Sequence, residues 1–123
     1  MNTITSKYSV PLYRAAHGRT GDKGDRSNIS VIAWHPALFD TIVQQVTAEV
    51  VAQIFRDRQP SAVTRYLLPN LHAMNVVIDN VLDGGVNHSK NLDTHGKALS
   101  FLLLDTLIEV DSELVKYLAP EVD

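Results

Sequence analysis

The chain contains no cysteine, so a disulfide framework, a thiolate zinc site and a cysteine nucleophile are all excluded. Positive charge is in deficit, because 11 Lys and Arg residues stand against 14 Asp and Glu residues, which gives a net charge of −3. A protein that coats nucleic acid or a membrane surface needs a clustered positive excess. We therefore predict no nucleic-acid partner and no membrane partner.

Long apolar runs are also absent, since none approaches the ~18–20 residues that a membrane span requires. The first six residues lack the charged and apolar regions of a signal peptide, so a cytoplasmic protein is expected. A chain of 123 residues suits one compact domain. We predict a disordered N-terminus over residues 1–7, a single domain over residues 8–110 and an acidic C-terminal tail over residues 111–123.

The apolar pattern predicts strands that alternate with helices. Short β-branched or alternating segments predict strands over residues 8–16, 29–34, 62–68, 72–82 and 106–110. Apolar residues at three- and four-residue steps predict one helix between Pro36 and Pro60 and a second helix over residues 95–105. Because Pro11 cannot donate to an inner ladder, we expect the first strand at a sheet edge. The segment 86–92 fits either a strand or a loop.

From Ile29 onward this order is β-α-β-β-α-β, and one additional strand precedes it. Two helices on one face of an antiparallel sheet form a two-layer sandwich. The sequence therefore predicts an α+β, ferredoxin-like fold with an additional N-terminal strand.

The segment from His17 to Asn28 is unusually rich in turn-forming residues, so we predict a long loop there. Its three glycines are spaced by three residues and allow a ligand to approach the backbone closely. Its cations, hydroxyls and free N–H groups together form the donor set of an anion site. The alternative is a structural hairpin loop in which Asp22 and Asp25 pair with the neighbouring cations.

Two histidines and one asparagine are candidates to line this site. His17 ends one predicted strand and His72 begins another, so the two converge on the glycine loop if these strands are neighbours. Asn75 interrupts an apolar strand and either ties down the loop or faces a ligand. None of the five histidines has His-x-x-x-His spacing to another, and the loop matches neither a Walker nor a dinucleotide fingerprint. We expect no metal and no cofactor.

Several collinear blocks resemble the C-terminal ferredoxin-like domain of the acyclic terpene utilisation (AtuA) family. The blocks are Ala16–Asp25, Asn28–Ala33, Thr47–Val51, Arg65–Asn75 and Leu92–Leu99, within a similarity that spans roughly residues 8–110. The resemblance implies the same α+β fold and a role in the catabolism of acyclic terpenes and branched acyl compounds, without assigning a reaction to the small domain. It also implies that the larger N-terminal domain of the long family form is a separate partner chain or is absent.

We therefore predict a small domain that binds an anionic metabolite, an acyl-CoA or a carboxylate, as a subunit or accessory of a catabolic enzyme. The predicted binding residues are His17, Arg19, Thr20, Gly21, Lys23, Gly24, Arg26, His72 and Asn75. The alternative is a non-catalytic oligomerisation module. Phe101, Leu104 and Leu107 favour it, because a helix that is apolar on two sides needs two neighbours. We expect a homo-oligomer.

Overall fold

The computed structural model describes residues 6–23, 26–80 and 99–120. Its main sheet has four antiparallel strands in the order β2-β3-β5-β4. These strands are β2 (Ala16–Lys23), β3 (Arg26–Ala33), β4 (Ala62–Leu68) and β5 (Ala73–Asp79). A separate antiparallel ribbon pairs β1 (Lys7–Pro11) with β6 (Leu107–Asp111).

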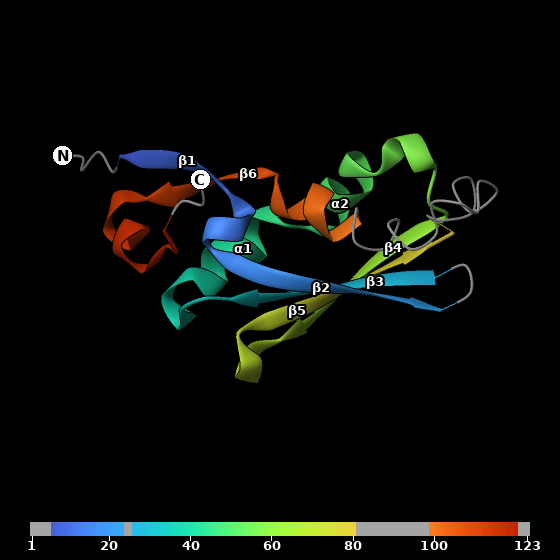
Figure 1. Ribbon diagram of the computed structural model, residues 1–123, viewed down its shortest axis with the longest axis horizontal. Helices are drawn as coiled ribbons and strands as arrows, with labels where there is room; N and C mark the ends of the chain where they lie inside the picture. Colours follow the sequence, from blue (N-terminus) through green and yellow to red (C-terminus); the bar gives the residue numbers. More distant parts are fainter. Residues whose placement is uncertain (1–5, 24–25, 81–98, 121–123) are drawn as a thin grey trace.

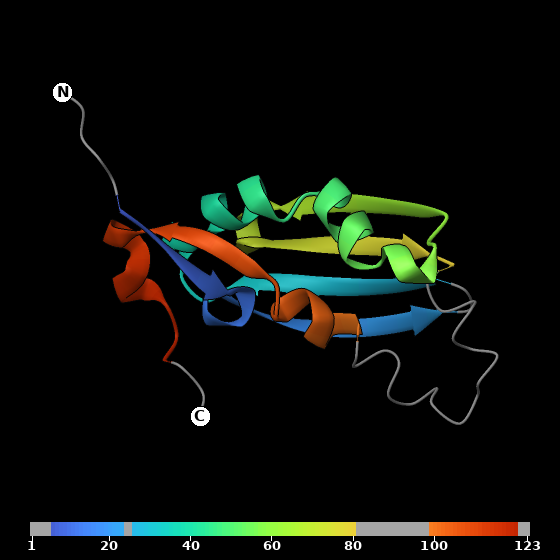
Figure 2. The same cartoon turned by 90° about the horizontal axis from the view of Figure 1, so that it is seen from above.

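The helices cover one face of the main sheet (Figure 1). Helices α1 (Phe39–Gln45) and α2 (Ala48–Ile54) lie above β4 and β5, whereas the helical residues 99–104 lie above β2 (Figure 2). Short 3-10 helices connect the elements: η1 (Leu12–Arg14), η2 (Pro36–Leu38), η3 (Arg56–Arg58), η4 (Pro69–Leu71) and η6 (Ser112–Tyr117). None of the helices described has the length and hydropathy needed to cross a bilayer.

The core lies between the main sheet and this helical layer. Alternate residues of the inner strands are fully buried there, as expected for a sheet with one covered face. The buried side chains include Ile29 and Val31 of β3, Met74, Val76 and Ile78 of β5, and Ile42, Val51, Leu99 and Leu103 of the helices. The predicted α+β, ferredoxin-like sandwich is confirmed, with its antiparallel sheet and its helices on one side.

The helix predicted between Pro36 and Pro60 is broken into two. The chain leaves α1 at Val46, and Thr47 begins α2 by accepting a hydrogen bond from the Val50 N–H at 3.1 Å. The Arg65 guanidinium fills the gap, because its Nη1 donates to the carbonyls of Val43 and Val46 at 2.6 and 2.8 Å. The prediction of one continuous helix was wrong because the apolar periodicity continues through the break.

The loop predicted from His17 to Asn28 is wrong, because most of this segment forms β2 and the start of β3. Residues Ala16 to Lys23 pair in register with Ala33 to Arg26. The glycines serve close packing: a Cβ atom at Gly18 would lie 2.8 Å from the Ser30 carbonyl oxygen, and one at Gly21 would lie 2.7 Å from Asn28 Oδ1. The glycines that predicted a turn thus belong to a strand, where the close approach of β3 leaves no room for a side chain.

The single strand predicted over residues 8–16 is also wrong, because Pro11 ends β1 and the chain turns through η1 before β2 begins. As a result, β2 occupies the edge of the main sheet beside β3, and the last strand, β6, pairs with β1 in the ribbon. β1 begins at Lys7, one residue before the predicted start of the domain. The segment 86–92 and the beginning of the second helix lie outside the described residues.

Side-chain contacts fasten the ribbon and the tail to the rest of the domain. The Gln45 side chain donates from Nε2 to the Glu109 carbonyl at 2.5 Å and accepts from the Glu109 N–H at 2.8 Å. Tyr117 of η6 stacks on His35, with ring centroids 3.9 Å apart. Arg14 Nε donates to the Ala119 carbonyl at 2.9 Å. The tail therefore packs against the domain up to the last residues described.

Candidate functional site on the open face of the main sheet

The face of the main sheet opposite the helices carries no other described segment (Figure 1). We call it the open face. Strand alternation and register place the following side chains on it: His17 and Arg19 of β2, Asn28, Ser30 and Ile32 of β3, Thr64, Tyr66 and Leu68 of β4, and Asn75, Val77 and Asp79 of β5. The open face is therefore polar at its centre, where the covered face is apolar.

One row of polar side chains crosses all four strands of the open face. Arg19 pairs with Ser30, Ser30 with Asn75, and Asn75 with Tyr66. Neighbouring strands lie about 4.8 Å apart, so the row extends for roughly 14 Å. We call these four residues the polar row. Two of them, Arg19 and Asn75, were predicted to bind the ligand, and the register places them on either side of Ser30.

Arg19 is the cation of the polar row. Its side chain is exposed, and it takes part in no ion pair with another residue that the structure describes. Arg26 differs, because its Nε donates to Asp79 Oδ1 at 2.6 Å across the β3–β5 pair. Hydrogen bonding and attraction to this carboxylate raise the pKa of Arg26 above its ordinary value. Of these two predicted anion ligands, Arg19 is the one whose charge is free.

Asn75 is tied to the neighbouring strand and also faces outward. Its Oδ1 accepts a hydrogen bond from Asn28 Nδ2 at 3.0 Å. Asn75 was predicted either to tie down a loop or to face a ligand. Since it bonds to β3, it fixes the amide group in the middle of the polar row.

His17 lies two residues from Arg19 on the same face of β2, about 6.7 Å along the strand. Its ring packs on Trp34, with centroids 4.4 Å apart. Trp34 is half exposed and donates from Nε1 to the Tyr13 carbonyl at 3.1 Å. Trp34 therefore has a fixed orientation at the end of the open face, although it was not among the residues predicted from the sequence.

The other predicted residues lie apart from this group. His72 has a left-handed backbone at φ 51°, and its ring is T-shaped to that of Phe39 of α1, with centroids 5.9 Å apart. It does not meet His17, because β3 lies between β2 and β5. Thr20 points to the helical side of β2, where its Oγ1 is buried without a hydrogen-bond partner among the described residues. Gly21 packs against Asn28, Lys23 ends β2, and Gly24 lies outside the described residues.

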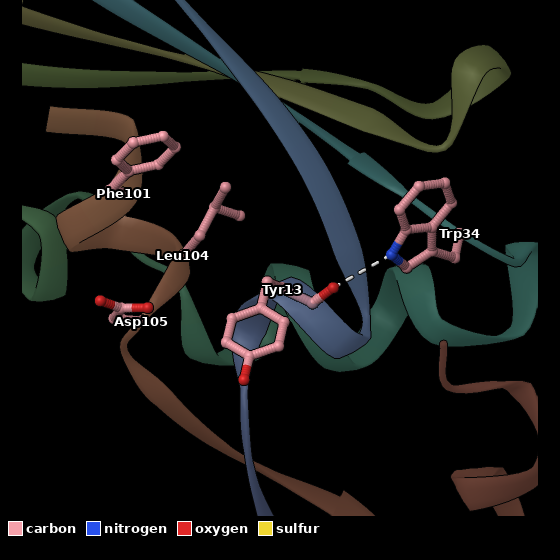
Figure 3. Close-up of a pocket in the computed structure, with 5 residues that line it drawn as sticks. All are labelled: Tyr13, Trp34, Phe101, Leu104 and Asp105. Carbon is pink, nitrogen blue, oxygen red and sulfur yellow. Dashed lines mark hydrogen bonds between the residues drawn. The ribbon is translucent and has the colours of Figure 1, made fainter. Parts of the chain in front are cut away.

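A groove runs along the outer side of β2, next to the open face (Figure 3). It has a volume of about 620 Å³ and is lined by Tyr13, Trp34, Phe101, Leu104 and Asp105. Trp34 stands at one end of the groove and also stacks on His17. The groove therefore provides an apolar surface beside the polar one. No three His, Asp or Glu side chains gather as a metal site in the part of the chain described.

Charge is divided unevenly between the two sides of the domain. Asp79, which is paired with Arg26, is the one described carboxylate of the open face. The other described acidic side chains are carried by the helical layer and the ribbon: Asp40, Glu49, Asp57, Asp105, Glu109, Asp111 and Glu113. Among the described residues, the one carboxylate of the open face is thus bound to Arg26. None of the others lies on this face to compete with an anion for Arg19.

Residues 10–109 match the family model described as the AtuA ferredoxin-like domain. No curated protein and no solved structure matches the chain significantly. The match covers the whole main sheet, including Arg19 and Asn75 of the polar row.

Proposed function

Since the chain belongs to the AtuA ferredoxin-like domain family, we propose that it binds an anionic metabolite on the open face of its main sheet. The ligand is an acyl-CoA or a carboxylate, and the domain serves as a subunit or accessory of a catabolic enzyme. The larger AtuA-type domain is then supplied by a separate chain. The ligand site differs from the glycine loop predicted from sequence, because that segment is a strand.

The observation that carries this proposal is the charge of Arg19, which forms no ion pair within the described part of the chain. An exposed guanidinium in a row with a hydroxyl and an amide offers several donors to one acid group. Arginine binds carboxylate and phosphate groups through two parallel N–H bonds, which fixes their orientation. Ser30 lies next to it in the polar row and adds a hydroxyl, and Asn75, one strand further on, adds an amide. The acid group of the ligand is therefore placed over β2 and β3.

The rest of the ligand extends toward the apolar end of the open face. His17, Ile32 and Leu68 form the next row of side chains, and Trp34 lies beside His17. Apolar contact there stabilises a carbon chain, while the polar row holds its acid group. This division favours an amphiphilic anion over a small inorganic one.

Isothermal titration calorimetry with acetyl-CoA, coenzyme A and short branched carboxylates tests the proposal. A hydrogen bond to a charged group contributes about 1.5–3 kcal/mol, so Arg19→Gln is expected to weaken binding about 10- to 100-fold. The matched control is Arg56→Gln, which removes an exposed arginine at the end of α2. Equal binding by the wild type and Arg19→Gln, or equal losses in both variants, would refute the site.

A further inference from the structure

β4 is an apolar edge of the main sheet. No described strand pairs with its outer side. Leu67 and Leu68 are 41% and 42% exposed, and Leu71, in the η4 turn that follows, is 65% exposed. Leu67 is on the helical side and Leu68 is on the open face, so both sides of this strand end are apolar and exposed. Natural proteins usually protect such an edge with charges or cover it.

The charged side chain of β4 is bound to the helical layer of its own domain. Arg65 is its one charged residue, and the guanidinium is bound to the Val43 and Val46 carbonyls of the helical layer. The opposite edge strand, β2, carries the exposed Arg19 and three further ionisable residues in its sequence. Pairing two copies through β4 therefore brings together only the two Arg65 side chains, each held by carbonyls of its own helical layer, whereas pairing through β2 would place several charged side chains in one ladder.

A hollow lies beside the other end of β4. It has a volume of about 310 Å³ and is lined by small side chains of α2 and β4, among them Ala48, Ala52, Ala62 and Val63, with the exposed Glu49 also at its wall. The strand thus carries projecting leucines at its end and an alanine-lined hollow at its start. In an antiparallel pair of two β4 strands, the end of one lies against the start of the other.

The register that joins these features is centred on Arg65. It sets Leu67 of one copy opposite Val63 of the other, and Leu68 opposite Ala62. Residues directly opposite each other in a sheet share a face, so Leu67 enters the hollow on the helical side. The twofold symmetry repeats the contact, because the same surface serves both copies. The surface is self-complementary, and this identifies the partner as a second copy of the chain.

We propose that two copies of the chain pair antiparallel through β4, so that their main sheets become one continuous sheet. Both helical layers lie on one side of that sheet, and both open faces lie on the other. The interface differs from the one expected from the sequence, which was based on Phe101, Leu104 and Leu107. The proposal is independent of the ligand, because the polar row reaches β4 only at Tyr66.

Sedimentation equilibrium of Leu67→Lys and of the matched variant Leu107→Lys tests this dimer. Leu107 is the matched control because it is also an exposed leucine, at 64%, but lies on β6. We expect a dimer for the wild type and for Leu107→Lys, and at least a tenfold weaker dimer for Leu67→Lys with an unchanged circular dichroism spectrum. A monomeric wild type, or a dimer that is lost in Leu107→Lys and kept in Leu67→Lys, would overturn the proposal.

Cross-linking gives a second readout that does not depend on a destabilising change. The chain has no native cysteine, so Thr64→Cys carries a single thiol. In the proposed register the two Thr64 residues are diagonal neighbours, roughly 7–8 Å apart. A bismaleimide of that length should therefore link two Thr64→Cys chains and leave Leu107→Cys chains unlinked. Failure to link Thr64→Cys, or equal linking of both variants, would count against β4.

Discussion

The covered and open faces of the main sheet come from the same strands, yet their side chains differ in kind. On β3, Ile29 and Val31 are fully buried under the helices, while Ser30 lies between them on the open face. On β5, Asn75 lies between the buried Met74 and Val76. A half-buried strand alternates in this way whenever one of its sides has no cover. Ser30 and Asn75 therefore mark the open face, which also carries Arg19, whose side chain forms no ion pair with the described residues.

The largest expected effect comes from truncating the same residue type on each face of β3. Ile29→Ala removes a fully buried side chain and should lower the free energy of unfolding by about 2–5 kcal/mol. Ile32→Ala, on the open face of the same strand, should cost less than about 1 kcal/mol, because its side chain is only partly buried. Urea denaturation measures both. Equal losses would mean that the open face is covered in solution.

Arg65 should be the most costly charged residue to replace. Arg65→Met leaves the Val43 and Val46 carbonyls without their donor, and a hydrogen bond from a charged group contributes about 1.5–3 kcal/mol. Arg65→Lys should recover only part of this loss, because both bonds come from Nη1 and the lysine side chain is one atom shorter. Urea denaturation measures the three free energies of unfolding. Full recovery by lysine would show that the charge alone is needed.

The two glycines of β2 test the difference between the faces, because Gly18 lies on the covered face and Gly21 on the open face. Gly18→Ala brings a Cβ atom to 2.8 Å from a backbone oxygen of β3, so the strand must shift, at a cost of about 1–2 kcal/mol. Gly21→Ala meets the side chain of Asn28, which can rotate away, so its cost should be smaller. Thermal denaturation followed by circular dichroism ranks the two. A larger loss for Gly21→Ala would contradict the difference in the atoms that each Cβ meets.

The smallest effect is expected at the Arg26–Asp79 ion pair. Arg26 is exposed and its pKa is raised by Asp79, so its charge contributes to the pair throughout neutral and mildly alkaline pH and is lost only in strong alkali. Between pH 6 and pH 9, Arg26→Gln should therefore lower the melting temperature slightly and by a constant amount. In 1 M NaCl this difference should nearly vanish, because salt screens exposed charges. A difference that varies with pH in this range would point to another titrating group.

Much of the fold could be predicted because its signals are local. The apolar run from Ile29 to Ala33 and the amphipathic patterns of α1 and α2 identify a buried strand and core-facing helices. The break between α1 and α2 at Val46 could not be predicted from that pattern. The Val46 carbonyl is bound by Arg65, which lies on β4, far along the sequence. The glycine-rich segment was misread because glycine occurs both in turns and where neighbours lie close, and a single sequence does not separate the two.

The candidate site was predictable in its chemistry and not in its geometry. Arg19 and Asn75 stood out as a cation in a glycine-rich segment and as an amide in an apolar strand. Arg19 and Asn75 lie in one row only because of the register of β2, β3 and β5. This register brings together residues up to 56 positions apart, so no short segment of the sequence indicates it. Trp34 and Tyr66 were missed, although a search for aromatic residues in or next to polar strand segments would have found both.

The amide of Gln45 acts as a single peptide unit added to the terminal ribbon. By giving Glu109 both a donor and an acceptor, it occupies the position that the backbone of a third strand would take. Growth of the ribbon past this point is blocked by one side chain, without a proline or a charged residue. An assembly that extends the ribbon along the outer edge of β6 must first displace this amide from Glu109.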